Sequence, residues 1–505
     1  MKKKIIVIVC FCLSLSMSFV LGGCGLFSVP KKVIVKIPGK FKYSVKNSSK
    51  NQSYLINSDW WKNFDDARLD VLVNDAEKNN LNYMIAIKNI KVARTYVSQS
   101  ESSLFPTINF SFSSTRNKMP GYQNSLISGS ASSGNSSSPS AVIYNLNQAG
   151  LSASYELDVW NQLNNAVKQA RANVAVSKED ADVIKLTLIS NVVQAYFQIK
   201  TLDSATKNLK NQYSAQKEIF NLYAVQYKDG LINAQQVENA KTTLEIIKTE
   251  LNDSIELKDT TQNTLAYYLG EFTERFNFNI SGNNINNINK IDKLNELKTR
   301  NYSKLIPPNI PSLILTQRPD VKEAEYNVLS YAYAEKESLA NFFPTFSLTG
   351  NYGYASTGLN NFVNNTDSVW NFGLNLLAPI FNYKENISIY KRSMLQYQQA
   401  VLNYRNTIIN AFSETDSALV SYKKNLNTLT SYRKNYAYSI KLYNIYRIQY
   451  KTGITGKITY LTYKLDMLAA KYNFINQNLL VKENIIDIYN ALGMGLTQNS
   501  KLDHK

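Results

Sequence analysis

Apolar side chains recur along this chain with two different periods, and each period is typical of one kind of element. Within 106–158 and 344–379, runs with an apolar residue at every second position alternate with Asn and Ser, and Phe110 and Leu151 belong to such runs. Most other segments carry apolar residues three and four positions apart, as amphipathic helices do. We therefore predict two β-hairpins, over about 106–158 and 344–379, with helices before and after each.

Two of the predicted helices are unusually long. Residues 162–228 and 384–452 contain no Gly and no Pro, and a second Gly-free and Pro-free segment follows each after a short turn. Small residues at helical spacing, such as Ala170, favour close packing of the paired helices. We predict coiled-coil pairs over about 162–269 and 384–492, in which a helix of roughly 67 residues reaches about 100 Å.

The order of helix, hairpin and long helix pair occurs twice, which indicates a tandem duplication. Phe105-Pro106-Thr107 is matched by Phe343-Pro344-Thr345, and Gln226-Tyr227-Lys228-Asp229-Gly230 is matched by Gln449-Tyr450-Lys451-Thr452-Gly453. We predict a first repeat over 59–270, a linker over 271–317, a second repeat over 318–495 and a C-terminal tail over 496–505.

The predicted strands number four per chain and are long enough, at about ten residues, to cross a bilayer when tilted. Four strands cannot close into a barrel, and an open sheet in lipid would leave unpaired backbone groups that cost several kcal/mol each. Several chains must then share one barrel, and the long helices would continue its wall as a hollow tube. The fold class we predict is a mixed α and β membrane protein.

The N-terminus has the layout of an export signal. Lys2, Lys3 and Lys4 precede an uncharged apolar run, which ends in Leu21-Gly22-Gly23-Cys24. This ending resembles a bacterial lipobox, in which the chain is cut before the cysteine and its thiol carries diacylglycerol while its amine carries an acyl chain. We expect a signal peptide over 1–23, lipidation at Cys24 and an extended tether over 24–58. The other two cysteines, Cys10 and Cys12, lie within the signal.

Charge and residue content argue against catalysis and against nucleic acid as a partner. The net charge is +18, but the lysines are scattered along long polar helix faces, and export separates the chain from nucleic acid. The single histidine is His504, and the sequence contains no metal, nucleophile or nucleotide motif. We expect no enzymatic activity, no metal and no cofactor other than the lipid.

An ordered set of short motifs resembles the TolC family of outer-membrane efflux proteins, and within it the lipoprotein channels of RND-type multidrug pumps. The set includes Tyr155-Glu156-Leu157-Asp158, Arg318-Pro319-Asp320-Val321 and Ala491-Leu492-Gly493. The resemblance implies a homotrimer in the outer membrane, with a 12-stranded barrel and a periplasmic α-helical barrel. It also implies a periplasmic adaptor and an inner-membrane transporter, of RND type, as partners.

The family gates its channel at the periplasmic helix tips, and the resemblance places these at Gly230 and Gly453. Relatives often carry aspartates just after the tip glycines. The matching positions here are Gln236, Thr459 and Thr462, with Lys457 nearby, so an acidic ring is not expected.

Two acids in the first hairpin are further candidates. Glu156 and Asp158 follow the polar phase of the second strand, and we expect both to face the channel lumen.

Two other functions remain open at this point. The family also includes ducts for type I protein secretion, which the motifs do not exclude. A coiled-coil lipoprotein adaptor that forms no channel would explain the helices and the anchor, but it would not explain four alternating strands.

Overall fold

The computed structural model describes most of the two repeats. The described residues are 35, 37–42, 59–120, 141–274, 302, 305–306, 310–359, 362–382 and 384–495. The signal peptide, Cys24 and the tail over 496–505 therefore lie outside the described residues, as do most of the tether and much of the linker.

The chain divides into two compact units, and each is described by itself. The first contains Lys91–Ala175 and Tyr326–Leu402, and the second contains Ile34–Ile90, Val176–Glu325 and Asn403–Lys505. Because each unit takes segments from both repeats, the duplication does not produce one domain per repeat.

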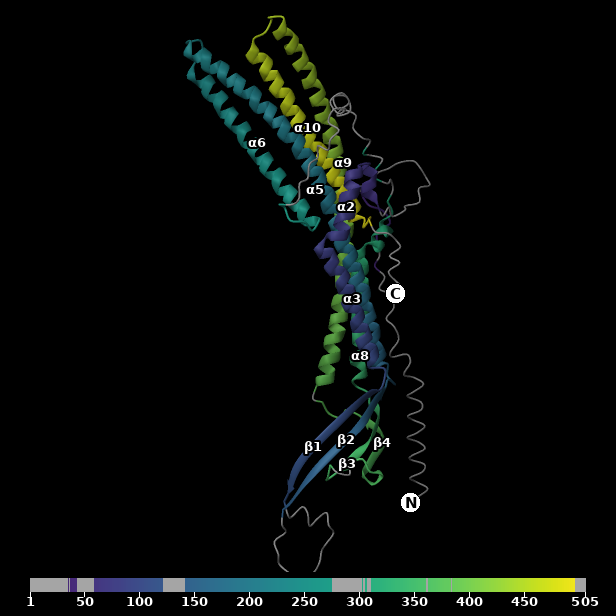
Figure 1. Cartoon of the computed structure of the whole chain (residues 1–505). Helices are drawn as coiled ribbons and strands as arrows, with labels where there is room; N and C mark the ends of the chain where they lie inside the picture. The colour runs from purple at the N-terminus through teal and green to yellow at the C-terminus, as the bar shows by residue number, and fades with distance from the viewer. Residues whose placement is uncertain are drawn as a thin grey trace, which may run out of the picture. The chain divides into compact units, whose positions relative to one another are not determined.

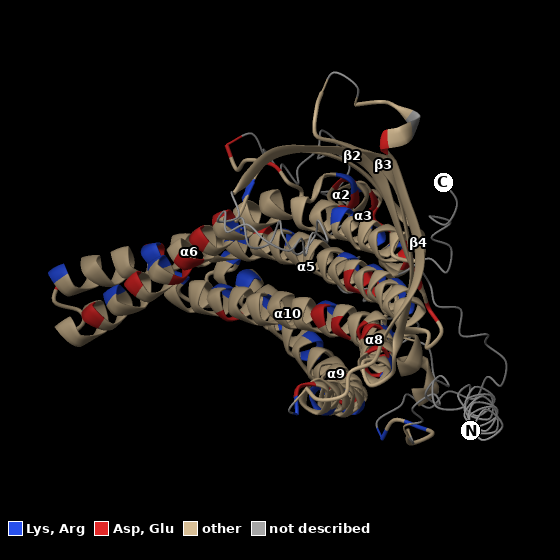
Figure 2. Cartoon of the chain, turned by 90° about the horizontal axis from the view of Figure 1, so that it is seen from below, with Lys and Arg blue, Asp and Glu red and all other residues tan. Residues whose placement is uncertain are grey.

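A four-stranded antiparallel sheet dominates the first unit (Figure 1). Its strands, in the spatial order β1-β2-β3-β4, are β1 (Thr107–Met119), β2 (Val142–Leu157), β3 (Thr345–Ser356) and β4 (Ser368–Leu377). β1 and β4 are the edge strands, so each has one side without a strand partner in the described chain. Figure 2 shows the strands curved and almost free of charged residues.

Strand register separates two chemically different faces of this sheet. Phe110, Leu151, Tyr352 and Trp370 are successive partners across the four strands, so their side chains share one face. This apolar face contains Ile108, Phe110, Phe112, Ala149, Leu151, Ala153, Tyr155, Leu157, Phe346, Leu348, Tyr352, Tyr354, Trp370, Phe372, Leu374 and Leu376. Phe110 is 71% exposed and Trp370 is 73% exposed, so much of this face is uncovered within the described chain.

Three of the four strands are longer than the ten residues expected. β1 has 13 residues, β2 has 16 and β3 has 12. The extra length of β2 lies at its start, where Val142, Ile143 and Tyr144 do not alternate with polar residues. The period-two signal therefore marked only the part of the strand that carries the apolar face.

The long helices have the predicted extents. α5 (Gln162–Lys228) and α9 (Glu385–Lys451) have 67 residues each, and each continues from the first unit into the second. They are followed by α6 (Ala234–Tyr268) and α10 (Lys457–Ala491), with 35 residues each. α9 and α10 begin 223 residues after α5 and α6 (385 against 162, and 457 against 234), which confirms the tandem repeat. None of the described helices is apolar enough over its length to cross a membrane.

The first repeat opens with two short elements. A 3-10 turn, Trp60–Phe64, precedes the helix α2 (Ala67–Asn79). Asp65 separates them because its φ of 52° lies in the left-handed region and breaks the helical path.

Aromatic contacts anchor this opening turn in the second unit. Trp60 stacks on Tyr489 of α10 with ring centroids 4.8 Å apart, and Phe64 packs against Phe197 of α5 at the same centroid distance. Trp60 and Phe64 are both buried, so the turn joins helices of the two repeats.

Two shorter helices complete the described part of the fold. α3 (Leu81–Ser102) leads into β1, and α8 (Pro319–Ala340) leads into β3, so each hairpin has a helix before it and a long helix after it. In the second unit, Ile189, Val192 and Ile199 of α5 and Ile485 and Ile488 of α10 are fully buried. These side chains form part of the core that fixes the position of the second unit's helices.

Candidate functional site

The two tip turns have the same backbone design. Gly230 has a φ of 73° and Gly453 a φ of 77°, a region that side chains other than glycine rarely adopt. After each glycine, the next amide donates to a carbonyl in the last turn of the long helix: Leu231 N to Gln226 O at 2.8 Å, and Ile454 N to Gln449 O at 2.8 Å. This is the Schellman arrangement, which ends a helix and reverses the chain.

The helices that return from the tips begin differently. The side chain of Asn233 caps α6 and accepts a hydrogen bond from the backbone amide of Gln236 at 3.3 Å. Gly456 occupies the corresponding position before α10 and has no side chain to cap with. The second tip therefore lacks a capping interaction that the first tip has.

The residues at the positions of the expected aspartates are exposed and neutral. Gln236, Thr459 and Thr462 are all exposed, and Thr462 Oγ1 donates to the carbonyl of Ile458 in its own helix at 3.0 Å. That no acidic ring forms at these positions stays a prediction.

Lys457 forms an ion pair with Glu218 of α5. The hydrogen bond and charge of Glu218 raise the pKa of Lys457 above its ordinary value. Beside the pair, Leu461 of α10 packs on Ala215 and Ile219 of α5, and all three side chains are buried. The start of the returning helix of the second repeat is thus attached to the long helix of the first.

A group of tyrosines joins α9 to α10 near the second tip. Tyr446 stacks on Tyr463 with ring centroids 3.6 Å apart and planes at 9°, and Tyr450 stacks on Tyr460 at 5.1 Å. The hydroxyls of Tyr443 and Tyr460 lie 3.4 Å apart, and this hydrogen bond together with burial raises the pKa of Tyr460 to about 12. The second tip is therefore held by aromatic packing and neutral hydroxyls as well as by the Lys457 ion pair.

Sequence reasoning missed Glu218 and these tyrosines. Tyr443, Tyr446 and Tyr450 are spaced by three and four residues, which places them on one helix face and is a signal that could have been read. No comparable signal marks Glu218, because its partner belongs to the other repeat.

Arg318 organises a second site, at the point where α8 begins and α10 ends. Its Nε and Nη2 donate to the two carboxylate oxygens of Asp320 at 3.0 and 2.7 Å, and Nη2 also donates to Glu414 at 3.0 Å. Burial alone would lower the pKa of Arg318, but these carboxylates hold the pKa above its ordinary value. Arg318 is only 8% exposed, so it is a buried cation with charged and backbone partners.

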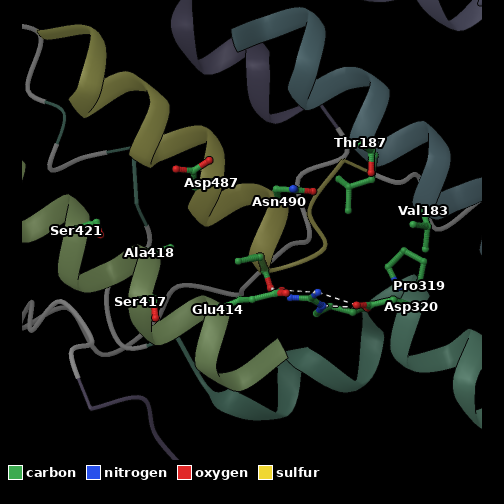
Figure 3. A pocket seen from close by; sticks show the side chains of 13 residues that line it. Val183, Thr187, Pro319, Asp320, Glu414, Ser417, Ala418, Ser421, Asp487 and Asn490 are labelled. Atoms are coloured by element: carbon green, nitrogen blue, oxygen red, sulfur yellow. Dashed lines mark hydrogen bonds and ion pairs between the residues drawn. The ribbon is translucent and has the colours of Figure 1, made fainter. Parts of the chain in front are cut away.

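A cavity of about 540 Å³ adjoins this guanidinium (Figure 3). Three carboxylates, from Asp320, Glu414 and Asp487, line it together with Ser417, Ser421 and Asn490. The dashed lines in Figure 3 run from the guanidinium to Asp320 and Glu414, whereas Asp487 lies apart from them. Burial raises the pKa of Asp487, as expected for a carboxyl group distant from the arginine.

The motif Ala491-Leu492-Gly493 packs against Arg318 at this junction. Gly493 follows α10 with a φ of 68°, and a Cβ added there would lie 3.0 Å from Cγ of Arg318 and 3.2 Å from its Cα. The motifs around Arg318 and Gly493, which are 175 residues apart in sequence, therefore form one packed unit.

The arrangement around this junction and the tips contains no nucleophile and base in contact, and the described residues include no group of three or more ligands able to hold a metal ion. The residues at these sites pack, brace and cap helices.

Comparison with known proteins decides the family. The Outer membrane efflux protein family matches residues 72–271 and 310–494, which is most of the chain. The chain belongs to this family. It is an outer-membrane efflux protein, and its relatives are transport ducts without enzymatic activity.

Relatives match this efflux protein over nearly its whole length. The cation efflux system protein CusC of Escherichia coli O6:H1 is 26% identical over 506 residues, covering 97% of this chain and 98% of CusC. The toluene efflux pump outer membrane protein TtgC of Pseudomonas putida is 25% identical over 482 residues, covering 95% of this chain and 94% of TtgC. The solved CmeC outer membrane channel of Campylobacter jejuni superposes with a TM-score of 0.78 at 25% identity, covering 93% of this chain and 95% of CmeC.

These findings confirm the resemblance to the TolC family, the fold class and the outer-membrane location. They also remove the alternative of a coiled-coil adaptor that forms no channel, because the matched family consists of efflux channels. The cargo is not determined by them, since CusC and TtgC are named for different substrates.

The two acids expected in the lumen of this efflux protein have different positions. Glu156 lies in β2 and is exposed, on the polar face and opposite Ser347 of β3. Asp158 lies beyond the end of β2, and its carboxylate accepts hydrogen bonds from the backbone amides of Leu163 and Asn164 at 3.1 and 2.8 Å. The prediction that Asp158 is a strand residue is therefore wrong, because its side chain satisfies the free amides in the first turn of α5.

Proposed function

We propose that this efflux protein is the exit duct of a tripartite pump, in which three chains form one channel through the outer membrane. The observation that carries the proposal is the sheet, which has a largely uncovered apolar face and two open edges, β1 and β4. In lipid, an open edge leaves amide and carbonyl groups unpaired at a cost of several kcal/mol each. Pairing β1 of one chain with β4 of the next removes these edges, and three chains supply 12 strands.

The polar face of the sheet becomes the lumen in this arrangement. It carries Ser, Thr and Asn side chains at most positions, and Glu156 is its charged residue within the four strands. A wall of neutral polar groups conducts hydrated solutes without strong selection by charge. We infer that the duct is passive and that the inner-membrane transporter selects the cargo.

The proposed role as an exit duct also implies partner proteins. A duct in the outer membrane needs a periplasmic adaptor and an inner-membrane transporter, for which we propose the RND type. Drugs or other small molecules are the cargo that this pump class suggests, and a duct for type I protein secretion is the alternative. The names of CusC and TtgC, a cation and a toluene efflux protein, illustrate that similar ducts serve different pumps.

We further propose that Cys24 carries diacylglycerol and an N-linked acyl chain that anchor the protein in outer-membrane lipid. The motif Leu21-Gly22-Gly23-Cys24 supports this. Intact-mass analysis of protein extracted from membranes should find a chain that begins at Cys24 and carries lipid. A mature chain that begins upstream of Cys24 without lipid would contradict the proposal.

The shared barrel can be tested with engineered cysteines, because Cys10 and Cys12 leave with the signal and Cys24 is lipidated in the proposed mature chain. Asn109 of β1 and Asn371 of β4 lie on the polar face of opposite edge strands. Three strand spacings, about 14 Å, separate them within one chain, which is too far for a disulfide.

The Asn109→Cys variant is combined in turn with cysteine at Asn371, Gly373 and Asn375 of β4, since the register between chains has to be found. Oxidation should give covalent dimers and trimers for at least one combination on a denaturing gel. The single variants cannot form closed rings and serve as controls. If no combination crosslinks and the native mass in detergent equals one chain, the proposed trimer is wrong.

A further inference from the structure

The β1/β2 hairpin extends beyond the rest of the sheet. Pairing of β2 with β3 starts at Asn147 and Ser356, whereas pairing of β1 with β2 continues for five more residue pairs, from Thr115 and Leu146 to Met119 and Val142. At about 3.4 Å per residue, this two-stranded ribbon, residues 115–119 and 142–146, is roughly 17 Å long. It lies at the end of the sheet away from α3 and α5, which is the side facing the cell exterior in the proposed channel.

A polar row separates the apolar face from the ribbon. Ser114 donates to Oδ1 of Asn147 at 2.7 Å, and Nδ2 of Asn147 donates to the carbonyl of Ser356 at 3.3 Å. These three residues follow Phe112, Ala149 and Tyr354, the last row of the apolar face, on the same side of the sheet. We take this row as the boundary of the hydrocarbon layer.

Two cations lie on the lipid-facing side just beyond that boundary. Because side chains alternate along a strand, Arg116 and Lys118 share a face with Phe110, Phe112 and Ser114. Both are exposed. Arg116 lies four residues past Phe112, about 13 Å along the strand and about 10 Å in height for a strand tilted by roughly 40°. Its long side chain can reach back toward the headgroup layer.

The charge of this hairpin is unbalanced. Residues 107–157 contain two basic residues, Arg116 and Lys118, and one acid, Glu156, which lies at the opposite end of the hairpin. The corresponding hairpin of the second repeat, residues 345–377, contains no Lys or Arg. The pair is thus a feature of the first repeat alone, and the duplicated fold does not require it.

We infer that Arg116 and Lys118 bind phosphate-bearing lipid headgroups of the outer leaflet, and so attach each of the three ribbons to the membrane surface. Two cations on a strand face that continues an apolar band meet anionic lipid with complementary charge and at the right depth. This interaction is separate from transport of cargo and from the anchor at Cys24.

The test uses the full-length protein in neutral detergent and, as the probe, fluorescent lipid A that carries two phosphates. The double variant Arg116→Gln with Lys118→Gln should bind the probe at least tenfold more weakly than the parent, because each cation near an anionic surface contributes about fivefold. The matched control, Lys207→Gln with Lys210→Gln, removes two exposed lysines from α5 and should bind as the parent does. Phosphatidylcholine, which has no net charge, should not compete.

Three results would overturn the inference. The double variant could bind lipid A as tightly as the parent, or the α5 control could lose as much affinity. Inorganic phosphate at equal phosphate concentration could compete fully, which would identify a site for free phosphate instead of lipid. If the double variant does not assemble, Lys118→Gln alone should weaken binding about fivefold, and unchanged binding would count against the inference.

Discussion

Arg318 Nη1 donates a 2.6 Å hydrogen bond to the carbonyl oxygen of Ala491, the last residue of α10. In the first repeat, the carbonyl of Tyr268, the last residue of α6, accepts a 2.9 Å hydrogen bond from Asn80 Nδ2. The same helix end is therefore satisfied in both repeats, by a neutral amide in one and by a buried cation in the other. Only the second arrangement requires carboxylate partners.

Replacing the buried cation should be costly. Arg318→Gln removes the buried cation and takes the guanidinium donor from Asp320 and from the Ala491 carbonyl, which keeps only the Thr415 hydroxyl at 3.1 Å, so we expect a loss of about 3 kcal/mol in the free energy of unfolding. Thermal unfolding of the purified protein measures this. Arg405→Gln, at an exposed position on α9, changes the charge equally and should shift the midpoint little. An equal shift in both variants would show that the cluster contributes nothing of its own.

Glycine substitutions at two helix ends should separate backbone strain from packing. Gly230 and Gly493 both have positive φ, but a Cβ would meet nothing within 4 Å at Gly230 and would approach Arg318 within 3.0 Å at Gly493. Gly230→Ala should cost about 1 kcal/mol from strain alone. Gly493→Ala should cost about 2 kcal/mol or more, because Arg318 must also move. Chemical denaturation compares them, and equal losses would argue against the contact.

Glu179 predicts a pH dependence. Burial raises its pKa to about 7, with Lys322 opposing the shift and Asp182 and Glu323 adding to it. A carboxyl whose pKa is raised on folding stabilises the fold at low pH, and this stabilisation is lost as the pH rises through about 7. Glu179→Gln should therefore raise stability by roughly 1 kcal/mol at pH 8 and change it little at pH 4.

Thermal unfolding at the two pH values tests this prediction. Glu250→Gln, at an exposed position on α6, removes the same charge and provides the control. A gain for Glu179→Gln that is as large at pH 4 as at pH 8 would mean that the amide packs better, and titration would then not be the cause.

The tips predict how the channel responds to cations. Gln236, Thr459 and Thr462 offer no charge to a divalent ion at the positions of the family's aspartates, and Lys457 is occupied by Glu218. We expect divalent cations added on the periplasmic side to change single-channel current only weakly. Thr459→Asp combined with Thr462→Asp should create a block that the parent lacks.

A control uses two other acids near the tips. Glu238 and Asp466 lie near the starts of the returning helices, and burial raises the pKa of Asp466. If the parent shows strong divalent block that disappears with Glu238→Gln or Asp466→Asn, the ring consists of these acids and the assignment of the tip positions is shifted.

The sequence predicted the helices well because one rule governs them. A segment such as Gln162–Lys228, free of Gly and Pro, has no residue that ends a helix, so its observed bounds equal the predicted ones. Alternation predicted the strands but made β2 too short, because Val142, Ile143 and Tyr144 at its start do not alternate with polar residues. Alternation is imposed by lipid on one face and water on the other, and it stops where both faces meet polar surroundings.

The contacts between repeats could not be predicted in the same way. Glu218 and Lys457 lie 239 positions apart, and nothing in the residues between them indicates that α5 packs on α10 at this height. Asp158 continued the alternation of β2, so the period favoured a strand. In the structure, the carboxylate of Asp158 instead accepts hydrogen bonds from two backbone amides at the start of α5.

The central claim is that this efflux protein forms a water-filled channel, and single-channel recording in planar bilayers tests it most directly. The purified full-length protein should produce discrete, long-lived conductance steps, and disulfides that close the barrel between β1 and β4 of neighbouring chains should leave those steps in place. A folded protein of three chains that inserts into the bilayer and gives no conductance, even with both tip turns opened by mutation, would contradict the claim.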